Sequence, residues 1–408
     1  MIKLFDEIQR VGTEGAGYAE PEFVYLNRTA RKEFAQIRDL LEEWFIHYPT
    51  SGQLDLRNRF RSPNDCQHKA AFFELFLHEL LLRLNCNVIL HPSLEGNTKV
   101  PDFLVEPQSN YKFYLEATVA TGESTDGASA RARENNVYDV MDRLIKSPDY
   151  FLWLTVRGAP TTPPPARKLA SFVNSQLDIL NYDEMLRIYD LEGYDSLPSW
   201  HFEHDGWQID IRPTPKKSKA RGKVGVRPIG MRSTDFHLVD HRTPIRDSII
   251  DKGRKYGKLD LPYVIAVNAI ELADEIDIME ALYGKEQFTF NIPDNATAIK
   301  EPKLTRALDG AWVSPKGPRY TRVSAILMAT RLNTWNIPRA VLCLYHNPWA
   351  QKPYQSVLNQ LSQAIPENGE IRWLDGKNAS TIFELPQSWP EKAAYRLTSV
   401  SRVEKKTE

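Results

Sequence analysis

The chain has 408 residues, of which 42% are hydrophobic and 26% are charged, a composition typical of a globular protein. The length predicts two or three domains, or one elaborated domain. Its 52 Lys and Arg residues balance 53 Asp and Glu residues, which excludes a histone-like or uniformly basic nucleic-acid binder. The three cysteines, Cys66, Cys86 and Cys343, form no C-x-x-C pair, which argues against a disulfide scaffold or a cysteine-rich zinc site. No stretch approaches the ~18–20 apolar residues of a membrane span, and the N-terminus lacks an apolar signal core, so we expect a cytoplasmic protein without membrane contact.

Apolar residues recur at helical spacing over residues 30–48 and again over 67–84. Three short strand-like segments follow at 87–91, 100–105 and 111–119, and after them come a polar helix at 128–146 and an apolar strand at 150–156. This order, α-β-β-β-α-β, predicts a compact α/β core with a mixed sheet over residues 66–158, preceded by an N-terminal helical region over 1–65.

A run of Thr and Pro at 161–165 predicts a stiff connection and a domain boundary. Beyond it we expect a C-terminal α/β region over 159–408. Its predicted helices lie near 166–190 and 244–256, and its predicted strands near 207–212, 262–268, 323–329 and 340–345. The sequence leaves open whether these strands extend the first sheet or form a second one.

Residues 211–234 contain eight Lys and Arg but no Asp or Glu, and their prolines and glycines predict a loop. Clustered cations gain affinity for phosphates through counterion release, so this basic loop is a candidate nucleic-acid contact. An ordinary solvated surface loop is the alternative. The candidate phosphate-binding residues of the loop are Lys216, Lys217, Lys219, Arg221 and Lys223.

The helix predicted at 67–84 carries one carboxylate on its apolar side. On a helical wheel Lys69, Glu79 and Arg83 share one face, which we expect to be exposed to solvent. Glu74 lies on the opposite face, among Ala and Leu residues. Burying a carboxylate costs several kcal/mol unless it is paired, hydrogen-bonded or bound to a metal. Glu74 is therefore a candidate site residue, and the alternative is a structural Glu that is satisfied by hydrogen bonds.

Two further carboxylates belong to neighbouring predicted strands. The strand at 111–119 alternates, with Glu116 and Thr118 on one face and apolar side chains on the other. Asp102 follows Pro101 at the start of the preceding strand, and the short turn between the two strands pairs them antiparallel. The two acids would repel each other unless a cation lies between them, and a hard divalent ion such as Mg²⁺ suits oxygen ligands of this kind.

Glu74, Pro101-Asp102 and Glu116-Ala117-Thr118, together with the α-β-β-β-α-β order, resemble the PD-(D/E)XK nuclease superfamily, which has the restriction-endonuclease-like fold. The resemblance covers about residues 66–158. It implies a nuclease in which Asp102 and Glu116 bind Mg²⁺ or Mn²⁺ directly, the Ala117 carbonyl is a third ligand, and Glu74 holds a water or a second ion. The metal would activate the attacking water and neutralise charge on the scissile phosphate.

One position departs from the family pattern. The motif ends in a Lys two residues after the second acid, where this chain has Thr118, and a neutral hydroxyl supplies no positive charge. Lys112 shares the strand face but lies four residues, about 13 Å, from Glu116. Lys252 and Lys255, on the helix predicted at 244–256, would approach only through tertiary packing, and of these we rank Lys255 first as the catalytic substitute.

The resemblance implies an endonuclease that acts on DNA in the cytoplasm, in restriction or antiviral defence. In some members of the superfamily a polar helix at the position of 128–146 touches the phosphate backbone, which makes Arg131 a candidate contact, and a solvated helix face is the alternative. RNA remains an alternative substrate because its cleavage chemistry is similar. Since two strands need two active sites, a homodimer or a defence-system partner protein is an expected partner. The rival hypothesis, motivated by Thr118, is a catalytically degenerate module that binds nucleic acid or a partner protein.

Overall fold

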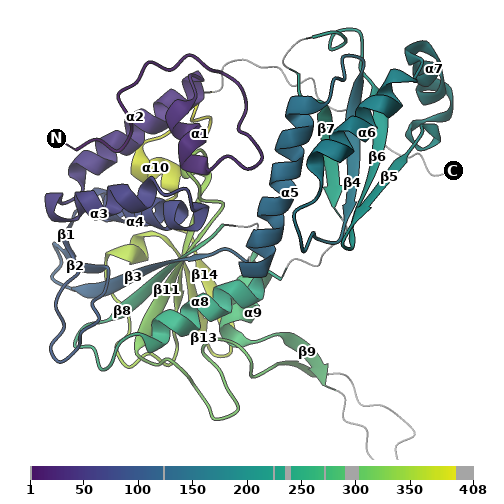
Figure 1. The fold of residues 1–408 in the computed structure, drawn as a ribbon. Helices are drawn as coiled ribbons and strands as arrows, with labels where there is room; N and C mark the ends of the chain where they lie inside the picture. The colour runs from purple at the N-terminus through teal and green to yellow at the C-terminus, as the bar shows by residue number, and fades with distance from the viewer. Residues whose placement is uncertain are drawn as a thin grey trace, which may run out of the picture. The chain divides into compact units, whose positions relative to one another are not determined.

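The computed structural model describes residues 2–122, 125–223, 226–234, 240–270, 273–289 and 303–391 (Figure 1). The chain forms two compact units. Unit 1 comprises residues 1–14, 21–122 and 240–408, and unit 2 comprises 15–20 and 123–239. Unit 2 is therefore largely an insertion within unit 1, and this division differs from the predicted boundaries after residues 65 and 158. Among the described helices none is long and apolar enough to cross a membrane.

Unit 1 is built on an eight-stranded mixed sheet with the order β1-β2-β3-β8-β11-β12-β13-β14. The central strands β3, β8 and β11 are parallel to one another, whereas β1, β2 and β3 are antiparallel. Every residue of β8 and β11 is buried, as expected for strands that are covered on both faces. The strands are β1 (Cys86–Leu90), β2 (Phe103–Pro107), β3 (Phe113–Ala120), β8 (Tyr263–Ala269), β11 (Val323–Thr330), β12 (Val341–His346), β13 (Ser362–Glu367) and β14 (Glu370–Leu374).

Helices cover both faces of this sheet (Figure 1). One face packs against α1 (Glu22–Arg28), α2 (Lys32–His47), α3 (Thr50–Phe60), α4 (Asp65–Arg83) and α10 (Ala379–Phe383). The other face packs against α8 (Arg242–Arg254) and α9 (Glu275–Tyr283). A hairpin of β9 (Glu286–Thr289) and β10 (Lys303–Arg306) follows α9.

Helix α4 is the central helix of the first face. Asn64 caps its N-terminus by accepting a hydrogen bond from the Cys66 amide at 2.9 Å, and Asn85, with a positive φ of 60°, follows its last turn. Every residue from Ala71 to Leu81 is buried, because neighbouring helices enclose α4 on the side away from the sheet. The prediction that Glu79 lies on the solvent-exposed face of this helix is wrong, because Glu79 is 2% exposed and contacts His47 of α2.

The helix–strand–strand–strand–helix–strand order is present in unit 1, but its last two elements differ from the prediction. They are α8 and β8, and β8 pairs directly with β3 in parallel. The predicted helix at 128–146 and strand at 150–156 do form, as α5 (Thr125–Leu144) and β4 (Tyr150–Arg157), but both belong to unit 2. The predicted C-terminal strands at 262–268, 323–329 and 340–345 extend the first sheet.

Unit 2 has its own core and its own four-stranded sheet with the order β5-β6-β4-β7. Strand β6 runs through Pro213 and Pro215, so the predicted basic loop begins as a strand. Both prolines lie beyond Ile211, the last residue of β6 that pairs with β5, where one edge of β6 needs no partner. The remaining elements are α6 (Ala166–Asp178), α7 (Tyr182–Glu192), β5 (Trp200–His204), β6 (Trp207–Pro215) and β7 (Ile229–Thr234).

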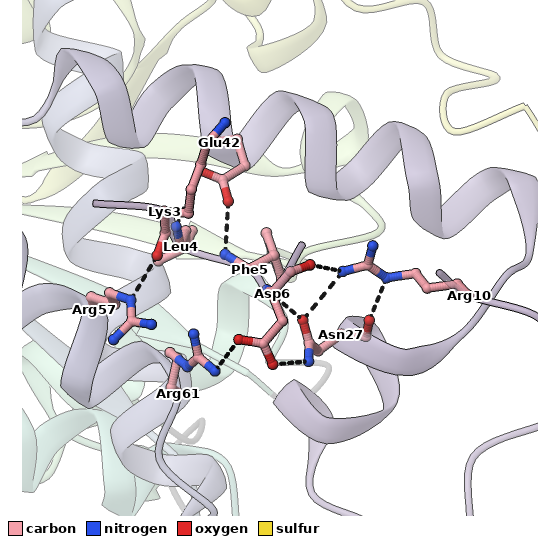
Figure 2. A network of polar contacts seen from close by, with 9 residues as sticks. All are labelled: Lys3, Leu4, Phe5, Asp6, Arg10, Asn27, Glu42, Arg57 and Arg61. Carbon is pink, nitrogen blue, oxygen red and sulfur yellow. Dashed lines mark hydrogen bonds and ion pairs between the residues drawn. The ribbon is translucent and has the colours of Figure 1, made fainter. Parts of the chain in front are cut away.

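Polar contacts fasten the N-terminal segment of unit 1 onto its helices (Figure 2). Arg57 Nε donates to the Lys3 carbonyl at 2.6 Å, and Arg61 Nη2 lies 2.5 Å from Asp6 Oδ1. The Glu42 carboxylate of α2 accepts the amides of Leu4 and Phe5. Arg57 of α3 and Arg61, which directly follows α3, are thus engaged in contacts within unit 1.

Because the two ends of the insertion lie close together, we predict that unit 1 folds without unit 2. Gly122 and His241 line one small cavity, so the chain leaves and re-enters unit 1 at neighbouring points. Replacing residues 123–239 by a short Gly/Ser linker, with Tyr18→Ser because that ring packs on the unit 2 core, should leave a cooperatively unfolding protein. Circular dichroism during heating checks this, and a non-cooperative or aggregated product would contradict it.

Candidate active site

Unit 1 brings the three predicted carboxylates together beside the middle of β3. Glu74 comes from α4, Asp102 from the residue before β2, and Glu116 from the middle of β3. The predicted alternation of β3 is confirmed, because Leu115 and Ala117 join the core beneath α4, whereas Tyr114 joins the core beneath α8. The Glu116 side chain accordingly meets groups of α8.

Asp102 replaces a missing strand partner. The β2–β3 ladder ends at the pair Phe103–Leu115, so the next part of β3 has no partner on that edge. The Asp102 Oδ2 atom accepts the Ala117 amide there at 2.7 Å. Since the N–H and C=O of one strand residue point to the same side, the Ala117 carbonyl also faces this edge.

Glu116 is fully buried, and each of its oxygens has a partner. Its Oε1 atom lies 2.7 Å from Lys252 Nζ and 2.6 Å from Lys255 Nζ, and its Oε2 atom lies 2.5 Å from the Tyr256 hydroxyl. The two lysines are three residues apart and therefore share a face at the end of α8. Burial alone would raise the pKa of Glu116, but Lys252, Lys255 and Tyr256 outweigh it and hold this pKa below its ordinary value.

Asp102 is in the opposite electrostatic situation. Its pKa is raised to about 6, first because burial disfavours the carboxylate and second because the charge of Glu116 repels it. The Ala117 amide and Lys252 oppose this shift without cancelling it. At neutral pH the Asp102 charge is thus poorly compensated.

Glu74 is 6% exposed, as predicted, and is satisfied by two partners that the sequence did not reveal. Its Oε1 atom accepts the Tyr48 hydroxyl at 2.5 Å, and its Oε2 atom pairs with Arg59 Nη1 at 2.8 Å. Arg59 lies on α3 and also pairs with Asp55 one turn earlier. Glu74 therefore positions a guanidinium at the site.

A cavity of about 180 Å³ lies between Glu74, Asp102 and Lys252, and Glu116 does not line it. Its polar lining comes from Glu74, Asp102, Thr118, Arg59 and Lys252, and its remaining lining from Ala70, Phe73, Ala117 and Val119. Both lysines reach Glu116, but of the two only Lys252 lines this cavity, so the preference for Lys255 over Lys252 does not fit the geometry. Lys112 pairs with Glu106 instead.

The site fits a divalent cation in part. Among the described residues no group of three or more His, Cys, Asp or Glu side chains forms a metal-ligand set. Asp102 suits the role, because its charge is undercompensated and the Ala117 carbonyl offers a second hard oxygen beside it. Glu116 and Glu74 are already engaged by Lys, Tyr and Arg partners, so they would ligate an ion only by exchanging these contacts.

The predicted phosphate-binding residues lie in unit 2, and their environments differ. Lys216 is 1% exposed and donates to the Ser147 carbonyl at 2.6 Å, so it is not the exposed phosphate contact that we predicted. Arg221 pairs with Asp149 and lies over the Tyr182 ring. Exposed side chains remain at Lys217, Lys219, Lys223 and, on α5, Arg131.

Comparisons with known proteins do not identify the chain, because no family model, no curated protein and no solved structure matches it. The interpretation of the site therefore depends on its geometry and chemistry.

Because the pKa of Asp102 is raised, we predict that replacing its carboxyl group by a neutral side chain stabilises the folded protein. The folded state binds this proton more tightly than the unfolded chain does, so the contribution of Asp102 to stability is present at low pH and is lost as the pH rises through about 6. In metal-free buffer Asp102→Asn should increase the free energy of unfolding by about 1–3 kcal/mol at pH 8 and by about half as much at pH 5, where the unfolded chain is already ionised. Urea unfolding at both pH values measures this difference.

The matched control is Glu106→Gln on β2, the strand that Asp102 precedes. Glu106 is paired with Lys112, which lowers its pKa, so its neutralisation should not stabilise the protein at pH 8. An Asp102→Asn variant that gains nothing at pH 8, or gains equally at both pH values, would contradict the assigned charge state.

Proposed function

We propose that the protein is a Mg²⁺- or Mn²⁺-dependent endonuclease that hydrolyses phosphodiester bonds in DNA and belongs to the PD-(D/E)XK superfamily. The observation that carries the proposal is the position of Lys252, which reaches Glu116 and lines the cavity shared by Asp102 and Glu74. A positive charge is therefore present in the site although Thr118 occupies the motif position of the Lys. The cellular role we propose is cytoplasmic restriction or antiviral defence.

The topology around the site supports the same proposal. The acids lie on α4, just before β2 and on β3. The element that follows in unit 1 is α8, which carries Lys252 and is directly followed by Lys255. The order α4-β1-β2-β3-α8-β8 is the one expected of a restriction-endonuclease-like core. The insertion of unit 2 separates β3 from α8 in the sequence, which explains why the motif and its cations lie more than 130 residues apart.

Each group in the cavity has a chemical role in this proposal. Asp102 and the Ala117 carbonyl would hold the divalent ion, which supplies a water of lowered pKa and neutralises charge on the scissile phosphate. Lys252 would bind a phosphate oxygen or orient the attacking water. Arg59, fixed by Glu74, adds a second cation to the cavity wall, and fixed cations stabilise charge that develops in the transition state.

Binding of DNA is supported by exposed cations in unit 2. Lys217, Lys219 and Lys223 lie between β6 and β7, and their exposed side chains are available to phosphates. Arg131 on α5 is also exposed. Cleavage of both strands would require a second active site, from a second copy of the chain or from a partner protein.

One observation favours the rival function, a degenerate module that binds nucleic acid or a partner protein. Both oxygens of Glu116 are occupied by Lys252, Lys255 and Tyr256, an arrangement that neutralises the acid without a metal ion. If these contacts persist in solution, the site would bind phosphates without cleaving them.

Cleavage of supercoiled plasmid with Mg²⁺ or Mn²⁺, and with EDTA as the metal-free control, tests the two functions. Asp102→Asn should reduce cleavage at least ~100-fold, because it removes the charge that holds the ion. Lys252→Met should reduce cleavage about 100-fold, and Lys255→Met less, because Lys255 does not line the cavity. Single-stranded DNA and RNA as substrates define the nucleic acid that is cleaved.

Lys112→Met is the matched control, since Lys112 lies immediately before β3 and pairs with Glu106 outside the site. Its cleavage rate should equal that of the unmodified protein. Undiminished cleavage by Asp102→Asn and Lys252→Met would refute the assigned site. Metal-independent binding of DNA without cleavage would establish the rival function.

A further inference from the structure

Unit 1 contains a second cavity, of about 640 Å³, that shares no lining residue with the candidate active site. It lies between α9, the base of the β9–β10 hairpin and the β13–β14 hairpin. None of the roles proposed above uses it.

Large apolar side chains line this groove and are exposed to solvent. Ile276 of α9 is 66% exposed, Trp349 is 37% exposed and Trp373 of β14 is 44% exposed. Tyr283 lies beside Trp349, with ring centroids 6.4 Å apart. Exposed apolar side chains that gather in one hollow, with polar residues around them, are characteristic of binding sites.

The polar residues around the groove are mostly acidic. Five glutamates line it against one arginine, Arg306, which is already paired with Glu286. The glutamates are Glu275, Glu280, Glu286, Glu367 and Glu370.

The cations near the groove do not neutralise this charge. Glu367 is paired with the neighbouring Arg372, but within the described chain Glu275, Glu280 and Glu370 have no cationic partner. The groove is therefore negatively charged and favours a cationic ligand. It would repel a phosphodiester backbone, which separates it in function from DNA binding.

The groove is also bordered by a strand edge. β14 is the last strand of the described sheet, and three of its residues, Glu370, Ile371 and Trp373, line the groove. The edge of such a strand presents backbone N–H and C=O groups without a partner in that sheet, and an extended peptide can pair with them.

We infer that this groove binds an extended, arginine- or lysine-containing segment of a partner protein. The segment pairs with the edge of β14 and places its cationic side chains among Glu275, Glu280 and Glu370. Its side chains also lie against the indoles of Trp349 and Trp373, where a guanidinium gains cation–π attraction. Aromatic rings and carboxylates that converge in one hollow match this ligand better than a neutral apolar peptide or an acidic one.

A fluorescently labelled heptapeptide of alternating Arg and Val is the probe, and a heptapeptide of alternating Glu and Val is its control. Anisotropy titration at 50 mM salt should show that the Arg peptide binds at least ~10-fold more tightly than the Glu peptide. Glu370→Lys and Trp373→Ser should each weaken binding about tenfold, and raising the salt to 300 mM should weaken it further. Glu370 is exposed, so Glu370→Lys should leave thermal unfolding unchanged. The Trp373 ring packs edge-on against Tyr345, with centroids 5.9 Å apart, so Trp373→Ser should lower the unfolding temperature but leave unfolding cooperative.

The matched controls lie in unit 2, where Glu192 and Leu191 are exposed in the same way. Glu192→Lys and Leu191→Ser should leave the affinity for the Arg peptide unchanged. Equal binding of the two peptides, or equal effects of groove and control variants, would overturn the inference. Sedimentation of the free protein as a dimer that Trp373→Ser dissociates would assign the groove to a second copy of the chain and would likewise overturn it.

Discussion

The burial of the Glu116 carboxylate is the constraint on which the candidate active site depends. A fully buried charge in the middle of a sheet is tolerated only when it is paired and hydrogen-bonded, and here α8 supplies two ammonium groups and Tyr256 a hydroxyl. The same contacts fix the end of α8 over β3, and this position brings Lys252 to the wall of the cavity. The cation that Thr118 cannot provide is therefore a consequence of how Glu116 is neutralised.

The partners that compensate the charge of Glu116 leave the charge of the neighbouring Asp102 poorly compensated. The carboxylates of Glu116 on β3 and of Asp102 just before β2 have pKa values displaced in opposite directions, downward for Glu116 and to about 6 for Asp102. Such a separation of pKa values is common where acids have different chemical tasks. Because Asp102 also faces the open edge of β3, its charge costs stability in the free protein and is available to a bound cation. This is the physical reason for proposing a metal site where three ligands are not already assembled.

The sequence predicted local features well and long-range contacts poorly. The burial of Glu74 and the two faces of β3 follow from periodicity within single elements. The partners of Glu74, Tyr48 and Arg59, come from other helices, and no spacing rule connects them to it. The insertion escaped prediction because α5 and β4 have the same local patterns as the elements that complete the core, and only the pairing of β3 with β8 distinguishes them. Lys216 looked exposed because a run of cations does not reveal that one of them reaches back to the Ser147 carbonyl.

Unit 1 thus combines a small polar cavity beside β3, where β3 extends past its pairing with β2, with an acidic, aromatic groove next to β14, the last strand of the described sheet. The central claim is that Asp102 holds a charge that a divalent ion neutralises. Calorimetric titration of Mn²⁺ into the metal-free protein tests it most directly. Binding at pH 7.5 should weaken about tenfold at pH 5, because a proton competes for Asp102, and should be lost in Asp102→Asn. Equal affinity at the two pH values, or Mn²⁺ binding that survives this substitution, would contradict the claim.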